Sequence, residues 1–471
     1  MFFDSIIYFI FLIAVVSLYW QLPHRKQNIA LLIASYFFYG WWDWRFLLLM
    51  AGSTLVDFFL ARKIEQSENS RQRKIMLVIS LVMNFGFLGF FKYFNFFVDS
   101  FDSMLSTVGI HQLPIAVLRI ILPPGISFYT FQEVAYIVDV YHRKLKAANS
   151  LIEYALFISL FPHLIAGPIQ RPSHLLPQVQ KPRAFDDSKF FDGLLLILSG
   201  LFRKCVIADN CALIANAAFG GNFGPPTLPV LLLGTYAFAW QIYGDFSGYS
   251  DIARGSAQLL GFHFMVNFRQ PYLAQTLQDF WRRWHISLST WLRDYLYIPL
   301  GGNRLGEKRT YFNLMMTMLL GGLWHGANWT FVVWGAIHGA VLAVERFFGL
   351  ADSVPAGPSS RLFVWVKRIF IFHLVCLSWI FFRARSVAES LQILSGITSW
   401  SWRPEFLVAF EFLAIFSIPL FVLDLILENS GVEYAFERRS PRFRVAFGLA
   451  LFLAVTYFSA SDTHAFIYFQ F

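Results

Sequence analysis

Charged residues are scarce in this chain, and their scarcity decides its class. Only 14% of the 471 residues are charged, whereas 57% are hydrophobic and 19% are aromatic. Soluble proteins carry about 25% charged residues, so a soluble globular fold is excluded. The net charge of +9 fits Lys-rich and Arg-rich loops on the cytoplasmic side of a membrane. No basic arm with interleaved aromatic residues lies outside the apolar stretches, so we expect no nucleic-acid partner.

Several ligand and nucleophile motifs are also missing. Cys205, Cys211 and Cys376 lie in or beside apolar stretches without metal-ligand spacing, so we expect no zinc site and no disulfide framework. The chain has no Gly-rich phosphate loop and no GxSxG elbow, and we expect no bound cofactor or metal. The first 20 residues lack a positive n-region and a small-residue cleavage site, which predicts a retained first span.

Apolar segments alternate with basic loops along the chain. Spans are predicted at residues 6–20, 28–41, 46–61, 75–97, 228–243, 369–382, 406–427 and 445–460, with one more before residues 142–146. Positively charged loops, at 24–26, 62–74, 142–146 and 438–444, are assigned to the cytoplasm. The weakly charged loop 101–114 and both termini, including HAFIYFQF at 464–471, are then expected on the outer, periplasmic side.

Residues 151–215 are irregular, because Pro, Gly and charged residues interrupt their apolar pieces, which predicts re-entrant or tilted helices. The expected fold class is an all-α polytopic membrane protein. Residues 1–471 are expected to form one integral membrane domain with about 11 to 13 membrane-embedded helices, some re-entrant or interfacial.

The segment GGLWHGANW, residues 321–329, is predicted to lie at the functional site of the protein. Residues 313–345 contain no Lys, Arg or Asp, and no Glu before Glu345, while basic residues flank them. This pattern indicates a hairpin of two short helices that turns near His325. A histidine inside a membrane segment usually faces a protein interior or a water-filled cavity, so His325 is the leading catalytic candidate. The alternative is that His325 only bonds a neighbouring carbonyl at the turn.

Two more histidines lie near this hairpin in the sequence. His285 belongs to an amphipathic region, 266–310, expected at the cytoplasmic face. If residues 279–297 are helical, His285 and Ser289 share one face, and His285 either assists catalysis or marks the polar boundary of an interfacial helix. His338 has small neighbours that favour close helix packing, so a structural hydrogen bond is expected for it.

Two buried histidines next to a basic cytoplasmic vestibule suit acyl transfer. A neutral imidazole can take the proton of an alcohol that attacks a thioester, and nearby donors can stabilise the oxyanion. The basic residues of 282–309 would suit an anionic donor such as coenzyme A. Candidates for the vestibule, which could equally only tie cytoplasmic helices together, are Arg282, Arg293 and Asn303, with Asp245, Asp251 and Asp294.

Specific motifs extend this interpretation. They are PPGISFYTFQEVAYIVDVY (123–141), FPHLIAGPIQRP (161–172), YGDFSGYSDIARGSAQLLGF (243–262), residues 280–304 and LWHGANWTFVVWGAIHG (323–339). This succession resembles the bacterial, alginate O-acetyltransferase-like branch of the membrane-bound O-acyltransferase (MBOAT) family.

The resemblance implies that His325 holds the family's essential histidine position and His285 its second, upstream polar position. It also implies a central funnel from the cytoplasm, with acetyl-CoA as the acyl donor. The enzyme is then expected in the bacterial inner membrane, where it would serve O-acetylation of an extracytoplasmic polysaccharide such as alginate, peptidoglycan or another exopolysaccharide. A periplasmic or membrane-anchored partner of esterase-like fold is also implied.

Two other classes remain as alternatives from the residues alone. A transporter of an acyl or lipid-linked substrate, without chemistry of its own, predicts paired intramembrane acids and bases or repeat symmetry, which the sequence does not display. A polytopic glycosyltransferase predicts acidic residues in a substantial outer loop, for which Asp99 and Asp102 are thin support.

Overall fold

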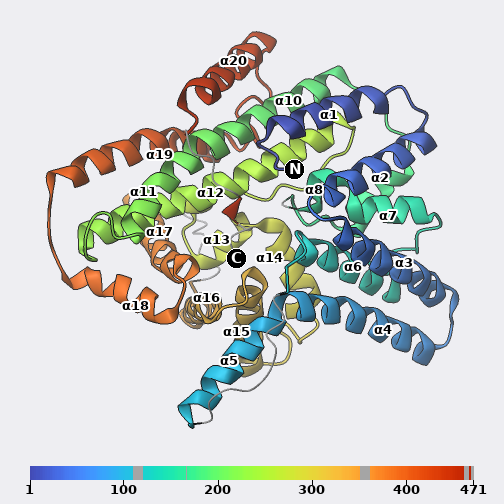
Figure 1. Ribbon diagram of the computed structural model, residues 1–471, viewed down its shortest axis with the longest axis horizontal. Helices are drawn as coiled ribbons and strands as arrows, with labels where there is room; N and C mark the ends of the chain where they lie inside the picture. The colour runs from blue at the N-terminus through green and yellow to red at the C-terminus, as the bar shows by residue number, and fades with distance from the viewer. Residues whose placement is uncertain (110–119, 166, 351–360, 461–465, 468–471) are drawn as a thin grey trace. The chain divides into compact units, whose positions relative to one another are not determined.

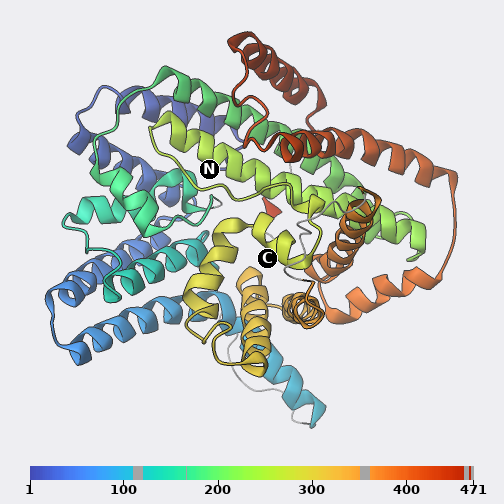
Figure 2. The same cartoon turned by 180° about the vertical axis from the view of Figure 1, so that it is seen from behind.

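The computed structural model describes residues 1–109, 120–165, 167–350, 361–460 and 466–467, and this part of the chain is built from helices (Figures 1 and 2). The residues group into two compact units. One contains residues 1–194 and 253–265, and the other contains residues 195–252 and 266–471. Residues 110–114 of the expected outer loop, and residues 464–465 and 468–471 of the C-terminal segment, lie outside the described residues. One integral domain over 1–471 stays a prediction.

The first unit is built from helices. Its helices are α1 (Ile6–Tyr19), α2 (His24–Gly40), α3 (Trp44–Gln66), α4 (Ser70–Leu88), α5 (Phe94–Thr107), α6 (Ile126–Tyr141), α7 (Leu151–Ser159), α8 (Phe161–Leu164) and α9 (Pro172–Gln180). A π-helical turn, η1 (Gly89–Tyr93), joins α4 to α5. Helices α3 and α4 run side by side (Figure 1).

The second unit carries both leading histidine candidates. Its helices are α11 (Asp209–Phe219), α13 (Leu277–Arg283), α14 (Ile286–Leu292), α15 (Glu307–His325), α16 (Trp329–Phe347), α17 (Arg361–Arg383), α18 (Val387–Ser395), α19 (Pro404–Ser430) and α20 (Pro441–Phe458). Shorter turns are η2 (Phe202–Ala208), η3 (Pro271–Leu273), η4 (Arg293–Tyr297) and η5 (Gly396–Thr398). The residue ranges of the two units meet within α10 (Asp187–Leu201) and α12 (Leu228–Leu259).

Six segments within the described residues are long and apolar enough to cross a membrane. They are Trp44–Gln66, Ser70–Thr107, Trp329–Phe347, Arg361–Arg383, Pro404–Ser430 and Pro441–Phe458. Many of their large apolar side chains face outward, such as Leu48 on α3 and Leu407 on α19. Outward-facing apolar side chains suit a lipid surround. The chain is therefore an all-α polytopic membrane protein, as predicted.

Two buried carboxyl groups of the first unit accept hydrogen bonds from side chains of neighbouring helices. Asp57 on α3 accepts from Ser80 Oγ at 2.5 Å and from Asn84 Nδ2 at 2.7 Å, both on α4. Glu133 on α6 accepts from two hydroxyl groups of α3, each at 3.0 Å. Because an apolar surround makes an unsatisfied carboxyl group costly, these contacts fix how α3, α4 and α6 pack together.

The observed helices differ from the expected ones in three places. The helix considered over residues 279–297 is broken at Trp284 and His285, where His285 has a φ of 44°. Helix α12 continues through residues 245–255, and α18 had no predicted counterpart. The irregularity expected over 151–215 is confirmed, since short helices and the π-helical turn η2 fill this range.

Candidate active site

His325 is the last residue of α15, where the chain turns into α16. Helices α15 and α16 lie side by side as a hairpin (Figure 1). The chain leaves α15 in extended conformation at Gly326, and Asn328 Oδ1 then caps α16 by accepting from Thr330 N at 3.0 Å. The two helices are in close contact because a Cβ atom at Gly322 would overlap a backbone carbonyl of α16. The predicted hairpin and the break in helix at His325 are confirmed.

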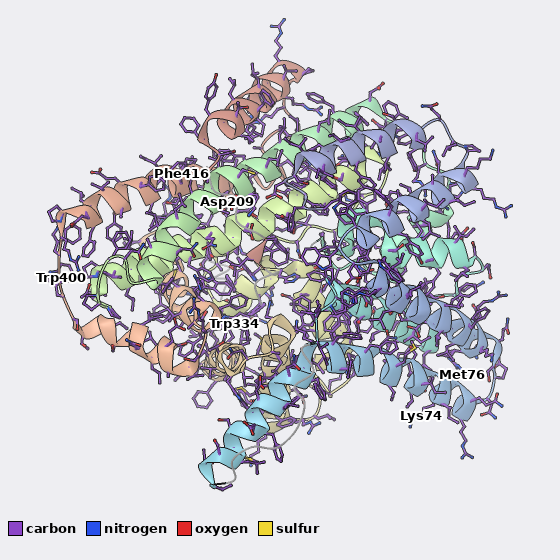
Figure 3. All side chains as sticks on the ribbon, viewed as in Figure 1. Lys74, Met76, Asp209, Trp334, Trp400 and Phe416 are labelled. Carbon is purple, nitrogen blue, oxygen red and sulfur yellow. The ribbon has the colours of Figure 1, made fainter. Side chains whose placement is uncertain are left out.

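Aromatic rings surround His325. His325 is only 4% exposed. The His325 ring centroid lies 5.1 Å from those of Trp324 and Trp334 and 5.3 Å from that of Phe382, which come from α15, α16 and α17. Figure 3 shows Trp334 on α16 within this crowded region. The imidazole therefore sits in a largely apolar, water-poor environment.

The rings beside His325 continue as a row of indoles. Trp334 stacks on Trp379 with centroids 5.8 Å apart and planes 17° apart, and Trp379 lies 5.2 Å from Trp284. Trp281 meets Trp334 edge-on at 5.7 Å. These four tryptophans come from α13 and the residue after it, α16 and α17, so they join three helices around the site.

His285 lies fully buried at the break between α13 and α14. Its left-handed backbone is unusual for a residue with a side chain. Asn267 supports this conformation, because its carbonyl oxygen accepts from Ile286 N at 2.9 Å and its side-chain oxygen accepts from Ser287 N at 3.2 Å. The break turns the His285 ring toward the second unit's core rather than along a helix face.

The contacts of Asn267 also set the tautomer of His285. Ser287 N–H can only donate, so the Asn267 atom that faces it must be the side-chain oxygen. His285 Nδ1 lies 3.2 Å from the same oxygen and therefore carries the hydrogen. The lone pair of the neutral ring is then on Nε2. Burial lowers the pKa of His285 from 6.5 to about 3, so the ring is neutral at pH 7.

The fold brings the two sequence-predicted histidines together. The ring centroids of His285 and His325 are 6.4 Å apart, and Trp324 packs against both, at 5.7 Å and 5.1 Å. This separation allows both imidazoles to contact one small acyl group. Two buried nitrogen bases this close, one with a defined tautomer, are suited to general acid–base chemistry.

A cavity of about 630 Å³ in the same unit is lined by α13 to α16 and the residues between them. Its size is in the range of small-molecule sites, about 300–1,000 Å³. Among its lining residues are Arg282, Arg293 and Asn303, the three sequence-based candidates for the donor, together with Arg346. Glu345 also lines it, but its carboxylate accepts from two backbone N–H groups at the start of α13, at 2.6 Å and 3.1 Å.

The cavity and the histidines are linked by side chains that touch. Trp281 lines the cavity and meets Trp334, which in turn packs on His325. Ile286, the residue after His285, also lines the cavity. The cationic lining and the buried histidines are thus parts of one continuous region.

His338 has a structural place beside this region. Its Nδ1 accepts from Trp281 Nε1 at 3.2 Å. Ser378 Oγ donates to Val375 O at 2.7 Å, so at 2.9 Å from His338 Nε2 it accepts the imidazole N–H. Both ring nitrogens of His338 are thereby occupied in the described structure, as the small-residue surroundings predicted. His338 holds Trp281 and α17 in position.

Replacing His338 tests this structural role. We expect His338→Leu to lower the free energy of unfolding by about 1–3 kcal/mol, because it leaves the buried Trp281 N–H without its acceptor. The midpoint of thermal unfolding in detergent would fall accordingly. The matched control is His142→Leu at an exposed histidine, which should leave the midpoint unchanged. An unchanged midpoint in His338→Leu would contradict this structural role.

Two of the sequence-based vestibule candidates tie helices together instead of lining the cavity. Asp245 pairs with Lys204 at 2.9 Å, and Asp251 pairs with Arg203 at 3.5 Å. Both pairs join α12 to η2 and are largely buried. Asp294 pairs with Arg293 at 2.7 Å at a more exposed position. For Asp245 and Asp251, the structure therefore agrees with the alternative that these residues tie helices together.

Sequence reasoning missed Asn267 and the contribution of Phe466. Asn267 is a polar residue that is only 1% exposed, in the segment between α12 and η3. The available signal was a lone Asn in an apolar stretch. Phe466 is fully buried and stacks on Tyr249 at 4.3 Å. It also lies 5.7 Å from Phe246, whose ring packs on His285 at 4.6 Å. No signal in the sequence located this contact.

The described residues contain no group of three or more His, Cys, Asp or Glu side chains arranged to hold a metal ion. Cys205, Cys211 and Cys376, all within the described residues, form no disulfide.

The fold and site define a polytopic helical membrane protein with two buried, adjacent histidines beside a cationic cavity. The sequence model of MBOAT, the membrane-bound O-acyltransferase family, matches residues 142–382, which include both histidines and the cavity. The chain belongs to this family and is an O-acyltransferase. The transporter alternative is not favoured.

Individual relatives agree with this membership. The probable alginate O-acetylase of Pseudomonas putida is 43% identical over 398 residues, covering 84% of this chain and 80% of the relative. The peptidoglycan O-acetyltransferase of Helicobacter pylori is 36% identical over 393 residues, covering 78% and 73%. The teichoic acid D-alanyltransferase of Bacillus subtilis is 28% identical over 282 residues, covering 55% and 68%.

Proposed function

We propose that this enzyme transfers an acetyl group from acetyl-CoA toward O-acetylation of an extracytoplasmic polysaccharide, with His325 as the general base or acyl relay and His285 as its assistant. The observation that carries the proposal is the 6.4 Å separation of the two buried imidazoles beside the cationic cavity. The polysaccharide acceptor is proposed from the relatives named for alginate and peptidoglycan O-acetylation.

The reaction needs one proton acceptor and one proton donor. In the direct route, His325 removes the proton of the acceptor hydroxyl as its oxygen bonds to the thioester carbonyl carbon. The C–S bond then breaks, and the same proton passes to the leaving thiolate. In the relay route an imidazole nitrogen of His325 bonds to the thioester carbonyl carbon, the C–S bond breaks, and the ring proton passes to the leaving thiolate. The acceptor hydroxyl then attacks the acetyl carbon, the C–N bond breaks, and the hydroxyl proton returns to the ring. His285, neutral and protonated on Nδ1, presents its Nε2 lone pair to the reacting groups and can share the proton.

The cationic cavity is proposed to hold the coenzyme A part of the donor. Arg282, Arg293 and Arg346 supply guanidinium groups that can bind phosphate oxygens in pairs, and Asn303 supplies a neutral amide. The cavity wall at Trp281 leads toward the rings that surround His325. A donor phosphate held at the arginines would therefore leave its thioester end directed to the histidines.

The cellular setting is proposed from charge and from the family. Basic loops assign the cavity to the cytoplasmic face of the bacterial inner membrane, with the N-terminus and the C-terminus on the periplasmic side. The acetyl group would then leave on the opposite side from the coenzyme. A periplasmic or membrane-anchored partner of esterase-like fold is proposed to complete its transfer to the sugar.

Arginine variants test the donor site. We expect Arg282→Gln and Arg293→Gln each to raise KM for acetyl-CoA by about tenfold with little change in kcat, because each removes a charged hydrogen-bond donor from the cavity. The measurement is thioester cleavage by the full chain in lipid nanodiscs with purified acceptor. Arg269→Gln is the matched control, since Arg269 is exposed and is not among the lining residues.

A change confined to kcat would contradict donor binding at these arginines, as would an equal effect of Arg269→Gln. The proposed reaction itself is tested on the unaltered enzyme. The acetyl-CoA assignment would be wrong if the unaltered enzyme did not cleave acetyl-CoA and formed acceptor ester only from an acyl donor of another chemical class.

A further inference from the structure

A second cavity lies in the same unit, bordered by α12, η3, α17 and α19, and has an almost wholly apolar lining. It encloses about 360 Å³. Apolar side chains that line it are Trp240, Phe372, Phe410, Leu413, Ile418 and Phe421. None of its lining residues is among those of the donor cavity, and it includes neither candidate histidine.

The cavity lies between two segments that can each cross a membrane. Helices α17 and α19 both meet that requirement of length and apolarity. Two of its lining residues, Ile369 on α17 and Ile418 on α19, are more than half exposed. Because these exposed side chains belong to membrane segments, the cavity opens toward lipid chains.

One end of this cavity is cationic. Arg368 belongs to its lining, donates to Leu273 O at 3.0 Å and to Glu428 at 3.3 Å, and stacks on Trp365. These hydrogen bonds use two of the five N–H donors of a guanidinium group. The Glu428 carboxylate also accepts a hydrogen bond from Arg283 Nη1 at 2.7 Å.

The start of α17 carries further positive charge. Glu428 pairs with both Arg283 and Arg368, and Arg283 also pairs with Asp279, while Arg361 and Lys367 add basic residues to the same helix as Arg368. Arg361 and Lys367 lie in the first two turns of α17 with Arg368. The region therefore attracts an anion beside an apolar chamber.

We propose that this cavity binds one anionic phospholipid, with an acyl chain between α17 and α19 and its phosphate at Arg368. An amphiphile with an anionic head matches a chamber that is apolar along its length and cationic at one end. Basic pockets between membrane helices are known to bind anionic lipid headgroups. The transmembrane helix of a partner protein would fill the apolar part without engaging the cationic end.

Photo-crosslinking of the unaltered full chain tests the proposal. The probe is phosphatidylglycerol with a diazirine in its acyl chain, added to protein in nanodiscs of phosphatidylcholine. We expect the crosslink to map to residues 410–421 of α19. Unlabelled phosphatidylglycerol should compete about tenfold better than phosphatidylcholine with the same acyl chains.

Two matched pairs of variants separate the chain from the headgroup. Ser417→Trp fills the cavity and should abolish the crosslink, whereas Ser417→Ala should keep it. Arg368→Gln should keep the crosslink but reduce the preference for phosphatidylglycerol about fivefold. Arg385→Gln removes the same charge from an exposed position just beyond the other end of α17 and should leave the preference intact.

Several results would overturn the proposal. Equal competition by the two lipids would mean that any acyl chain enters, and a crosslink that maps away from α19 would remove the site. Crosslinking of Ser417→Trp at the level of Ser417→Ala would do the same. If Ser417→Trp does not fold, the mapping and competition on the unaltered chain still decide the question.

Discussion

His325→Ala should reduce acyl transfer about 100-fold to 10,000-fold while the protein stays folded in the membrane. The reason is that the imidazole at the end of α15 is proposed to carry the proton or the acyl group, and alanine can do neither. The expected signature is a fall in kcat for acetyl-CoA cleavage with KM for the donor little changed, because the arginines of the cavity are untouched. In cells, the ester content of the surface polysaccharide should fall to the level of a strain lacking the gene.

Two comparisons make this result specific. His325→Gln preserves polarity and approximate size but cannot accept the proton at neutral pH, so it should be nearly as inactive as His325→Ala. His174→Gln changes a histidine that bonds a backbone carbonyl outside the site and should leave activity unchanged. Normal ester content in His325→Ala at normal protein abundance would assign His325 to the turn alone and move attention to His285.

Asn267→Leu is expected to reduce kcat about 100-fold through its effect on His285. Asn267 does not need to touch the substrate, because its side-chain oxygen fixes the Nδ1–H tautomer of His285 and holds Ser287 Oγ at 2.9 Å. Leucine has a similar volume but offers no acceptor. The imidazole then loses its defined tautomer, and the backbone break at His285 loses one of its supports.

A pH profile distinguishes this positioning role from a loss of packing. Asn267→Asp restores an acceptor and should recover part of the activity. Its negative charge favours protonated His285, which raises the pKa of that imidazole from its value of about 3. The acid limb of the activity profile should therefore move to higher pH than in the unaltered enzyme. An acid limb at the same pH, with no recovery of activity, would show that Asn267 acts only in packing.

The hairpin was predictable because its signals are local. The uncharged run 313–345 predicts buried helices, and the glycines near His325 predict a turn. Both signals depend on neighbours in the sequence, and α15 and α16 follow them. The position of His325 inside an apolar region also follows, since any residue at such a turn lies far from the charged ends.

The geometry of His285 was not predictable, because non-local contacts determine it. A helical reading of residues 279–297 assigns a normal backbone to His285, whereas the observed left-handed conformation is disfavoured by about 1–2 kcal/mol. Asn267, 18 residues earlier, offsets that cost with several hydrogen bonds. For the same reason the sequence left the roles of Asp245 and Asp251 open until Lys204 and Arg203 were seen beside them.

The row of indoles beside His325 has an optical consequence. Trp334 and Trp379 are 5.8 Å apart and nearly parallel, and Trp281 and Trp284 continue the row on either side. Rings this close share their excited states, so absorbed light is not confined to one indole. A change beside Trp334, an inner member of the row, therefore alters the aromatic circular dichroism that Trp334 shares with its neighbours Trp281 and Trp379. The enzyme thus carries an intrinsic spectroscopic probe in contact with its candidate catalytic imidazole.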